Sequence, residues 1–458
     1  MNALIIICGL GFVSLLAEIT NRKRGLHTAI IIGLVSAAVV VVMDWNSSLH
    51  YYNDMLVFDN FSIVFTALIL LVAGFWFCIS TTYFLKQPHQ TDRSALVVFA
   101  IAGGVMMVSF HNMAMLFLGI EILSISLYIL AGSNKESFFS NEAAFKYFLM
   151  GSFATGFLLM GIALIYGATG SFDISEISLS IEAHKTSLPI FFYSGVFLMF
   201  IGISFKISVV PFHFWAPDVY GGSPTLITAL MSTVVKIAAV GAFYKIFSGC
   251  FLSVQASIIS TIQVIIVLTL LVANITAVYQ NNVKRILAYS SIAHVGYILL
   301  GFISESVTFG GTLFYYLASY SIASLIAFSI LQGVENSTGG PALENFNGLY
   351  KKSPFGAITL TFSLLSLAGI PPLAGFFAKY FILVRAVKSD YLGLVILAVT
   401  ASLIGVFYYF KIIIAMFSKD PNDIQVKFSF FTTFIVVILT MLTLILGIFP
   451  DWMIRLLE

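Results

Sequence analysis

Apolar stretches long enough to cross a lipid bilayer follow one another along the whole of this sequence. The hydrocarbon core of a bilayer is about 30 Å thick, and a helix needs about 20 mostly apolar residues to cross it. Because a segment inside the bilayer must satisfy its own backbone hydrogen bonds, the sequence predicts an all-α integral membrane protein. About 14 transmembrane helices are expected, at 2–20, 26–43, 61–85, 94–110, 112–132, 143–169, 188–209, 223–248, 255–280, 285–303, 309–333, 355–386, 391–417 and 428–449.

The composition excludes several classes of protein. Hydrophobic residues make up 60% of the chain and charged residues only 9%, which leaves too little polar surface for a soluble globular protein. The formal net charge of +2 gives no basic excess for binding nucleic acid. Cys8, Cys78 and Cys250 match no disulfide, zinc or iron-sulfur spacing, and no glycine-rich nucleotide motif precedes a helix. The chain is therefore predicted to hold no cofactor or metal of its own.

Charges in the loops alternate along the chain. Cytoplasmic loops of membrane proteins are enriched in Lys and Arg, so the alternation predicts that both termini face the non-cytoplasmic side. The cations at 22–24 follow the first apolar run instead of preceding it, so that run is predicted to be a retained span, not a signal peptide. Odd-numbered loops hold Arg22, Lys23, Arg24, Lys86, Arg93, Lys135, Lys284, Arg285, Lys351, Lys352, Lys419 and Lys427. Even-numbered loops hold Lys185 and Lys388 but collect Asp44, Asp54, Asp59, Asp173, Glu176, Glu182, Glu305 and Asp390.

Two of the fourteen spans are predicted to be broken helices. Pro211 obstructs the end of span seven, and Pro371 and Pro372 follow Gly369 inside span twelve, which is too long for one straight crossing. The two breaks lie five spans apart, so their spans have opposite orientations. Paired broken helices of this kind are typical of transporters built from inverted repeats. Two unrelated proline kinks are the alternative.

The breaks therefore predict a division of the chain into four parts. Spans four to eight and nine to thirteen are expected to form two inverted five-helix repeats, at 94–250 and 251–420. An N-terminal three-helix segment, 1–93, precedes them, and a C-terminal helix, 421–458, follows them.

Ionisable side chains inside these spans are the candidate functional residues. A charged side chain at the centre of a bilayer costs about 2.5–3.5 kcal/mol on insertion scales, so such residues usually serve function. We expect a chain of groups that pass protons, in which Lys206 or Lys146 pairs with the buried Glu121 carboxylate. The candidates are Glu121, Lys146, Lys206, Lys236, His294 and Lys379.

Each candidate also has a purely structural alternative. Glu121 could belong to a static ion pair, and one of the lysines could only fix helix packing. Lys146 could form an interfacial pair with Glu142 at the i, i+4 spacing. His294 could be a hydrogen-bonded core histidine. Lys245, Arg385 and Lys411 lie near span ends, where such side chains usually act as anchors.

Three motifs give the chain a specific resemblance. They are GISFKISVVPFHFWAPDVYGGSPTLITALMSTVVKIA, VKRILAYSSIAHVGYILLG and LSLAGIPPLAGFFAKYFIL. Across about residues 55–420 the chain resembles the antiporter-like membrane subunits of respiratory NADH:quinone oxidoreductase, or complex I. It is most similar to the N-type subunits, since it carries Lys379 where the M-type has glutamate and ends without the long lateral helix of the L-type. Subunits of multisubunit cation/proton antiporters are the main alternative.

The resemblance implies a fold and a function. It implies a fourteen-helix core with broken helices seven and twelve, and a polar axis through Glu121, Lys206, Lys236 and Lys379, with Lys146 and His294 at recurrent family positions. The chain would translocate protons in the cell inner (plasma) membrane. NADH, FMN, iron-sulfur clusters and quinone would be held by partner subunits, and the L-, M-, K-, A-, J- and H-type membrane subunits would be its neighbours. A subunit with a structural role only is a further alternative.

Overall fold

The computed structural model describes residues 1–20, 25–84, 89–184, 187–254, 256–304, 309–418 and 426–457. Within these residues, 13 helices are long and apolar enough to cross a membrane. The remaining predicted span, 355–386, is divided into two shorter helices. The predicted all-α membrane architecture is therefore confirmed. The loop residues Arg22, Lys23, Arg24, Lys86, Lys185, Glu305 and Lys419 lie outside the described residues.

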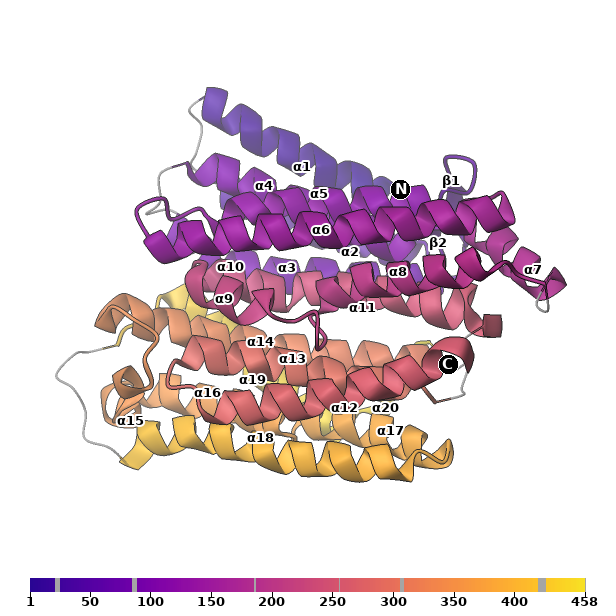
Figure 1. The fold of residues 1–458 in the computed structure, drawn as a ribbon. Coiled ribbons are helices and arrows are strands. Elements are labelled where there is room, and N and C mark those ends of the chain that lie inside the picture. The colour runs from indigo at the N-terminus through magenta and orange to yellow at the C-terminus, as the bar shows by residue number, and fades with distance from the viewer. Residues whose placement is uncertain are drawn as a thin grey trace. The chain divides into compact units, whose positions relative to one another are not determined.

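The chain forms two compact units (Figure 1). Unit 1 comprises Met1–Phe77, Tyr83–Ser208 and Val234–Thr261, and unit 2 comprises Cys78–Thr82, Val209–Thr233 and Ile262–Glu458. The bounds of these two units differ from those of the four predicted segments, because each unit contains parts of more than one segment. The predicted repeats at 94–250 and 251–420 and the flanking segments 1–93 and 421–458 stay a prediction.

Unit 1 is a bundle of long helices with a small hairpin at one end. An added Cβ on Gly161 of α6 would lie 2.7 Å from the Gly195 carbonyl oxygen of α8, so only glycine permits this close approach. The elements are α1 (Asn2–Ile19), α2 (Leu26–Met43), β1 (Leu49–Tyr51), β2 (Leu56–Phe58), α3 (Asn60–Phe84), α4 (Gln90–Ser109), α5 (Met113–Ala131), α6 (Phe138–Thr169), α7 (Ile174–Ala183), α8 (Ile190–Ile207), α11 (Val234–Tyr244), the π-helix η1 (Lys245–Cys250) and the 3₁₀ turn η2 (Leu252–Val254).

Unit 2 is arranged around α14. In the apolar stretch of α14, 94% of the residues are buried, whereas only 33% are buried in the apolar stretch of α18. α14 therefore forms the core and α18 an outer face. The elements are α9 (Trp215–Gly222), α10 (Thr225–Ser232), α12 (Ala256–Val278), which begins in unit 1, α13 (Val283–Phe302), α14 (Phe309–Thr338), η3 (Leu343–Phe346), α15 (Leu349–Lys352), α16 (Pro354–Ala368), α17 (Ala374–Lys388), α18 (Leu392–Ser418), α19 (Phe430–Ile448) and α20 (Asp451–Ile454).

Both predicted helix breaks are present. α8 ends at Ile207, where Ser208 adopts a left-handed backbone conformation with φ 64°, and Pro211 follows. α16 ends at Ala368, where Gly369 has φ +85°, and the helix resumes as α17 only after Pro371 and Pro372. Each break leaves carbonyl groups without a partner in the helix, and these groups need other donors.

A third break was missed by the sequence prediction. Span eight was expected to be one uninterrupted helix, but α10 ends at Ser232 and α11 begins at Val234. Thr233 between them has φ −112° and ψ −80°, and its hydroxyl donates to the Ala229 carbonyl at 2.7 Å. Side-chain bonds of this kind compete with the backbone ladder and bend membrane helices, and no proline marks the position.

Candidate functional site

Lys206 is buried in unit 1 next to a hydroxyl and two aromatic rings. It is the penultimate residue of α8 and is only 6% exposed. Its Nζ donates a hydrogen bond of 2.6 Å to Ser124 Oγ on α5. The same nitrogen lies 5.9 Å from the ring centroid of Tyr128 and 5.5 Å from that of Tyr147. The C-terminal end of α8 and the two ring faces all favour a positive charge at this point.

Glu121 lies one turn before Ser124 on α5. Its carboxylate interacts electrostatically with Lys206 and is partly exposed. The direct hydrogen bond of Lys206 goes to Ser124 instead, so the predicted direct pair with Glu121 is not formed in this state. The hydroxyl of Ser124 itself donates to the Ile120 carbonyl. Ser124 therefore accepts a hydrogen bond from Lys206 and donates one at the same time, as a hydroxyl group can.

Lys146 lies at the surface of this chain. Its Nζ is 2.8 Å from Glu142 Oε1, one turn earlier on α6, and both side chains are 39% exposed. This is the ion pair that the i, i+4 spacing allowed. The geometry gives Lys146 a local partner, whereas Lys206 is enclosed.

Lys236 is the most deeply buried of the candidates. It is the third residue of α11, directly after the break at Thr233, and is 2% exposed. α11 lies close to α4, since an added Cβ on Gly104 would be 3.3 Å from Ala238 Cβ. The break thus places a lysine at the beginning of a tightly packed helix inside unit 1.

Lys379 of unit 2 uses the acceptors that the second predicted break leaves free. Its Nζ donates to the carbonyl of Ala368, the last residue of α16, at 2.9 Å and to Ser402 Oγ at 3.1 Å. It also lies 4.7 Å from the centroid of the Tyr297 ring. The side chain is 7% exposed. The interruption of span twelve therefore creates the binding place of this ammonium group.

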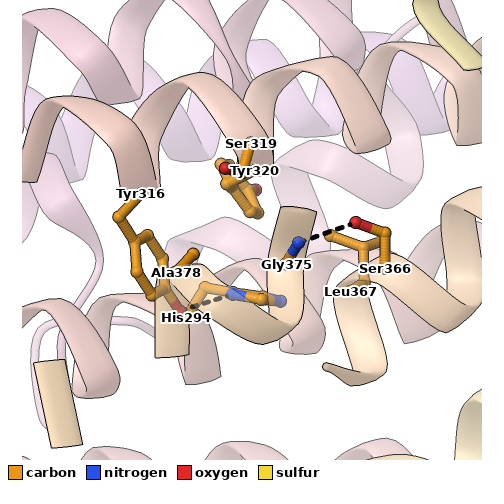
Figure 2. A pocket seen from close by; sticks show the side chains of 8 residues that line it. All are labelled: His294, Tyr316, Ser319, Tyr320, Ser366, Leu367, Gly375 and Ala378. Carbon is orange, nitrogen blue, oxygen red and sulfur yellow. Dashed lines mark hydrogen bonds between the residues drawn. The ribbon is translucent and has the colours of Figure 1, made fainter. Parts of the chain in front are cut away.

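His294 belongs to a buried polar network in unit 2 (Figure 2). Its Nδ1 lies 2.7 Å from Tyr316 Oη, and Tyr320 donates to Ser291 Oγ at 2.9 Å. His294, Tyr316, Tyr320 and Ser366 line a cavity of about 10 Å³, which is about the room that one water needs. Across the cavity, the Gly375 amide at the start of α17 donates to Ser366 Oγ at 3.1 Å.

Sequence reasoning missed the hydroxyl groups of these sites. Ser124 and Ser402 bind the buried ammonium groups directly, and Tyr316 binds His294. The sequence did offer one signal for Ser124: it is a serine one turn from a charged residue, Glu121, inside an apolar span. Ser402 and Tyr316 come from other helices, so sequence spacing gives no indication of their contacts.

Comparisons with known proteins identify the family of this chain. The family model described as "NADH:quinone oxidoreductase/Mrp antiporter, TM" matches residues 111–405. NADH-quinone oxidoreductase subunit N of Cytophaga hutchinsonii is 46% identical over 454 residues, which are 98% of each chain. The chain belongs to the NADH:quinone oxidoreductase/Mrp antiporter family. The subunit N of Flavobacterium johnsoniae is 45% identical over the full length of both chains, so the resemblance to N-type members is confirmed.

Solved structures of the family have the same fold. A chain of respiratory complex I from Thermus thermophilus is 30% identical, with a TM-score of 0.86 and coverage of 99% of this chain and 98% of that one. A chain of the Mrp complex from Dietzia sp. has a TM-score of 0.89 at 20% identity and coverage of 99% and 95%, which indicates a shared fold alone. The family fold therefore extends over both units of the chain.

Proposed function

We propose that this chain is the proton-translocating N-type membrane subunit of an NADH:quinone oxidoreductase. One observation carries the proposal: Lys206, Lys236 and Lys379 are each buried, and each lies within two turns of a break in a membrane helix. Buried ammonium groups are costly in a membrane and usually mark an ion pathway. A break in a helix leaves backbone carbonyl groups unpaired, and these can accept hydrogen bonds from a buried ammonium group.

The residues around each lysine suit proton transfer. Within unit 1, a proton on Lys206 can pass to Ser124, and a carboxylate at Glu121 electrostatically favours the charged state. Within unit 2, Lys379 faces Ser402, and His294 with Tyr316 is a second proton-exchanging pair. Lys236 contributes another ionisable group inside unit 1. Glu121, Lys206, Lys236, His294 and Lys379 are the residues we assign to translocation.

The redox chemistry would take place in other subunits. NADH, FMN, iron-sulfur clusters and quinone are assigned to these partners, and electron transfer there would drive the proton steps here as a translocase. The membrane neighbours would be the L-, M-, K-, A-, J- and H-type subunits in the bacterial plasma membrane. Both termini would face the non-cytoplasmic side, and the two five-helix repeats would be related by inversion.

A cation/proton antiporter subunit is the second candidate, because the fold is also that of an Mrp complex chain. The test uses membranes from cells that carry or lack the gene for this chain. We expect NADH addition to drive quinone reduction and proton pumping only with the chain present, at equal rates with and without sodium. Pumping that needs sodium and continues without NADH would support the antiporter instead.

Ser124→Ala should weaken pumping without loss of assembly. The substitution removes the acceptor of the Lys206 hydrogen bond, and hydrogen bonds to charged groups contribute about 1.5–3 kcal/mol. We expect NADH-driven pumping to fall by about tenfold or more, measured with a pH-sensitive dye in membrane vesicles.

Ser126→Ala is the matched control for this change. Ser126 lies on the same helix, and among the described residues its hydroxyl bonds only to the Ile122 carbonyl, at 2.9 Å. This variant should pump like the wild type. Equal pumping in both variants would contradict a role for Ser124.

A further inference from the structure

A second cluster of ionisable groups lies at one end of unit 1, apart from the lysines at the helix breaks. It contains Asp59, His111, Asp173 and Lys245. Four separate connections supply them: the β2–α3 junction, the α4–α5 junction, the α6–α7 loop and the π-helix that follows α11. In the topology predicted from loop charges, all four lie on the non-cytoplasmic side.

Backbone hydrogen bonds fix His111 between two neighbouring segments. Its amide donates to the Met55 carbonyl at 3.0 Å, and its carbonyl accepts from the Ile174 amide at 3.0 Å. Its Nε2 lies 2.9 Å from Ser175 Oγ and 3.8 Å from Asp173 Oδ1. The His111 and Asp173 side chains are 21% and 24% exposed, so water can reach a site that the backbone holds in place.

The surroundings of His111 favour its neutral form. Burial lowers the pKa of His111 from its usual 6.5, the Asp173 carboxylate partly opposes this shift, and the Lys245 ammonium adds to it. The ring is therefore mostly neutral at pH 7, and as a neutral imidazole it can still take up a proton that is delivered to it. Asp59 and His50 also act on the ring: Asp59 raises the pKa of His111, and His50 lowers it.

Lys245 joins this cluster to the interior of unit 1. Its Nζ donates to Ser62 Oγ at 3.2 Å, contacts the Val108 carbonyl at 3.4 Å and lies 5.6 Å from the centroid of the Phe110 ring. It also interacts electrostatically with Asp59. Lys245 begins the π-helix η1, and π-turns inside α-helices often occur at functional sites.

Two hydroxyl groups lead inward from Lys245. Ser62 and Thr66 lie one turn apart on α3, and both are 0% exposed. The Thr66 hydroxyl has no hydrogen-bond partner among the described residues. Buried polar groups are nearly always hydrogen-bonded, so an unpaired hydroxyl here points to a water at this depth. On α11, Lys236 lies about 13 Å further from the cluster than Lys245, at 1.5 Å per residue.

We propose that Lys245, with Asp59 and His111, is the group through which unit 1 exchanges protons with water on the non-cytoplasmic side. The proton leaves the Lys245 ammonium for Asp59, His111 or water, and the neutral amine takes another from the interior through Ser62 and Thr66. The proposal rests on the proposed function, because it assigns an end to the same proton path. If Lys245 only anchored the end of α11, its charge and its hydrogen bonds would suffice, and it would never need to release a proton.

Lys245→Arg separates these two roles. Arginine keeps the positive charge and donors for Ser62 and Val108, but it does not release its proton in proteins. We expect the purified complex, reconstituted in liposomes, to assemble normally while pumping falls at least about tenfold, as for loss of a proton-transfer group. Lys388→Arg changes an exposed cation at the end of α17, next to another loop assigned to the same side, and should pump like the wild type.

Asp59→Asn provides an independent second variant. Asp59 Oδ1 accepts from the Ser62 amide at 2.7 Å, and asparagine caps a helix about as well as aspartate. The fold should therefore survive, while the carboxylate can no longer take a proton. We expect pumping to fall severalfold. If the Lys245→Arg complex does not assemble, this variant decides the question.

The outcomes separate this proposal from the proposed function. Normal pumping by assembled Lys245→Arg overturns the exchange role and leaves Lys245 as an anchor, and normal pumping by Asp59→Asn overturns the assignment of its carboxylate. If Lys236→Met loses pumping in the same preparation while these variants pump normally, only this proposal fails. If Lys236→Met also pumps normally, the proposed function itself fails.

Discussion

Replacing Lys236 with methionine should abolish NADH-driven proton pumping while the complex stays assembled. Lys236 is 2% exposed at the start of α11, and methionine fills a similar volume without a charge. Replacing buried charge by an apolar side chain of similar size is often tolerated by the fold. Positioned proton-transfer groups contribute about 10²- to 10⁴-fold to rates, so pumping should fall by about 100-fold or more.

Three measurements on the same membranes test this expectation. Native gels report assembly, quinone reduction reports electron transfer, and a pH-sensitive dye reports pumping. Because pumping and electron transfer are coupled, both rates should fall together. Lys135→Met, at an exposed lysine between α5 and α6, is the control and should change neither rate. Loss of assembly in Lys236→Met would favour a structural role, and undiminished pumping would exclude Lys236 from the relay.

Gly375→Ala should be the most damaging single methyl addition at the second predicted break. An added Cβ would lie 1.8 Å from the Ser366 carbonyl oxygen and 2.6 Å from its carbonyl carbon. Both contacts are with backbone, so α16 and α17 would have to separate. Overpacking of this kind costs about 1–3 kcal/mol and occasionally more. The shift would also disturb the cavity beside His294 (Figure 2). It would move the Ala368 carbonyl that accepts from Lys379 as well.

The expected result is a lower thermal midpoint of the purified complex together with reduced pumping. Gly393→Ala is the matched control, since Gly393 is also the second residue of its helix and an added Cβ there meets no atom of the described residues within 4 Å. Alanine should be neutral or stabilising by up to about 1 kcal/mol at that position. A Gly375→Ala complex as stable as the Gly393→Ala complex would show that the two helices can separate at little cost.

The fold could be predicted from the sequence because each span carries its own signal. A bilayer requires about 20 apolar residues per crossing, so the spans were predicted to within a few residues at most ends. The breaks at Pro211 and at Pro371 and Pro372 were predicted because proline lacks the backbone donor. The break at Thr233 was not, because threonine interrupts a helix only through a hydroxyl bond that depends on its surroundings.

The candidate lysines could also be found in the sequence, because an ammonium group in an apolar span is conspicuous and costly. Their partners could not. Lys206 lies 82 residues from Ser124, Lys379 lies 23 from Ser402, and Lys245 lies 183 from Ser62. Hydrogen bonds act over about 3 Å, so only the packing of the helices decides which hydroxyl meets each charge. The sequence by itself determined the spans and the buried charges, and the tertiary structure alone decided which hydroxyl groups lie next to those charges.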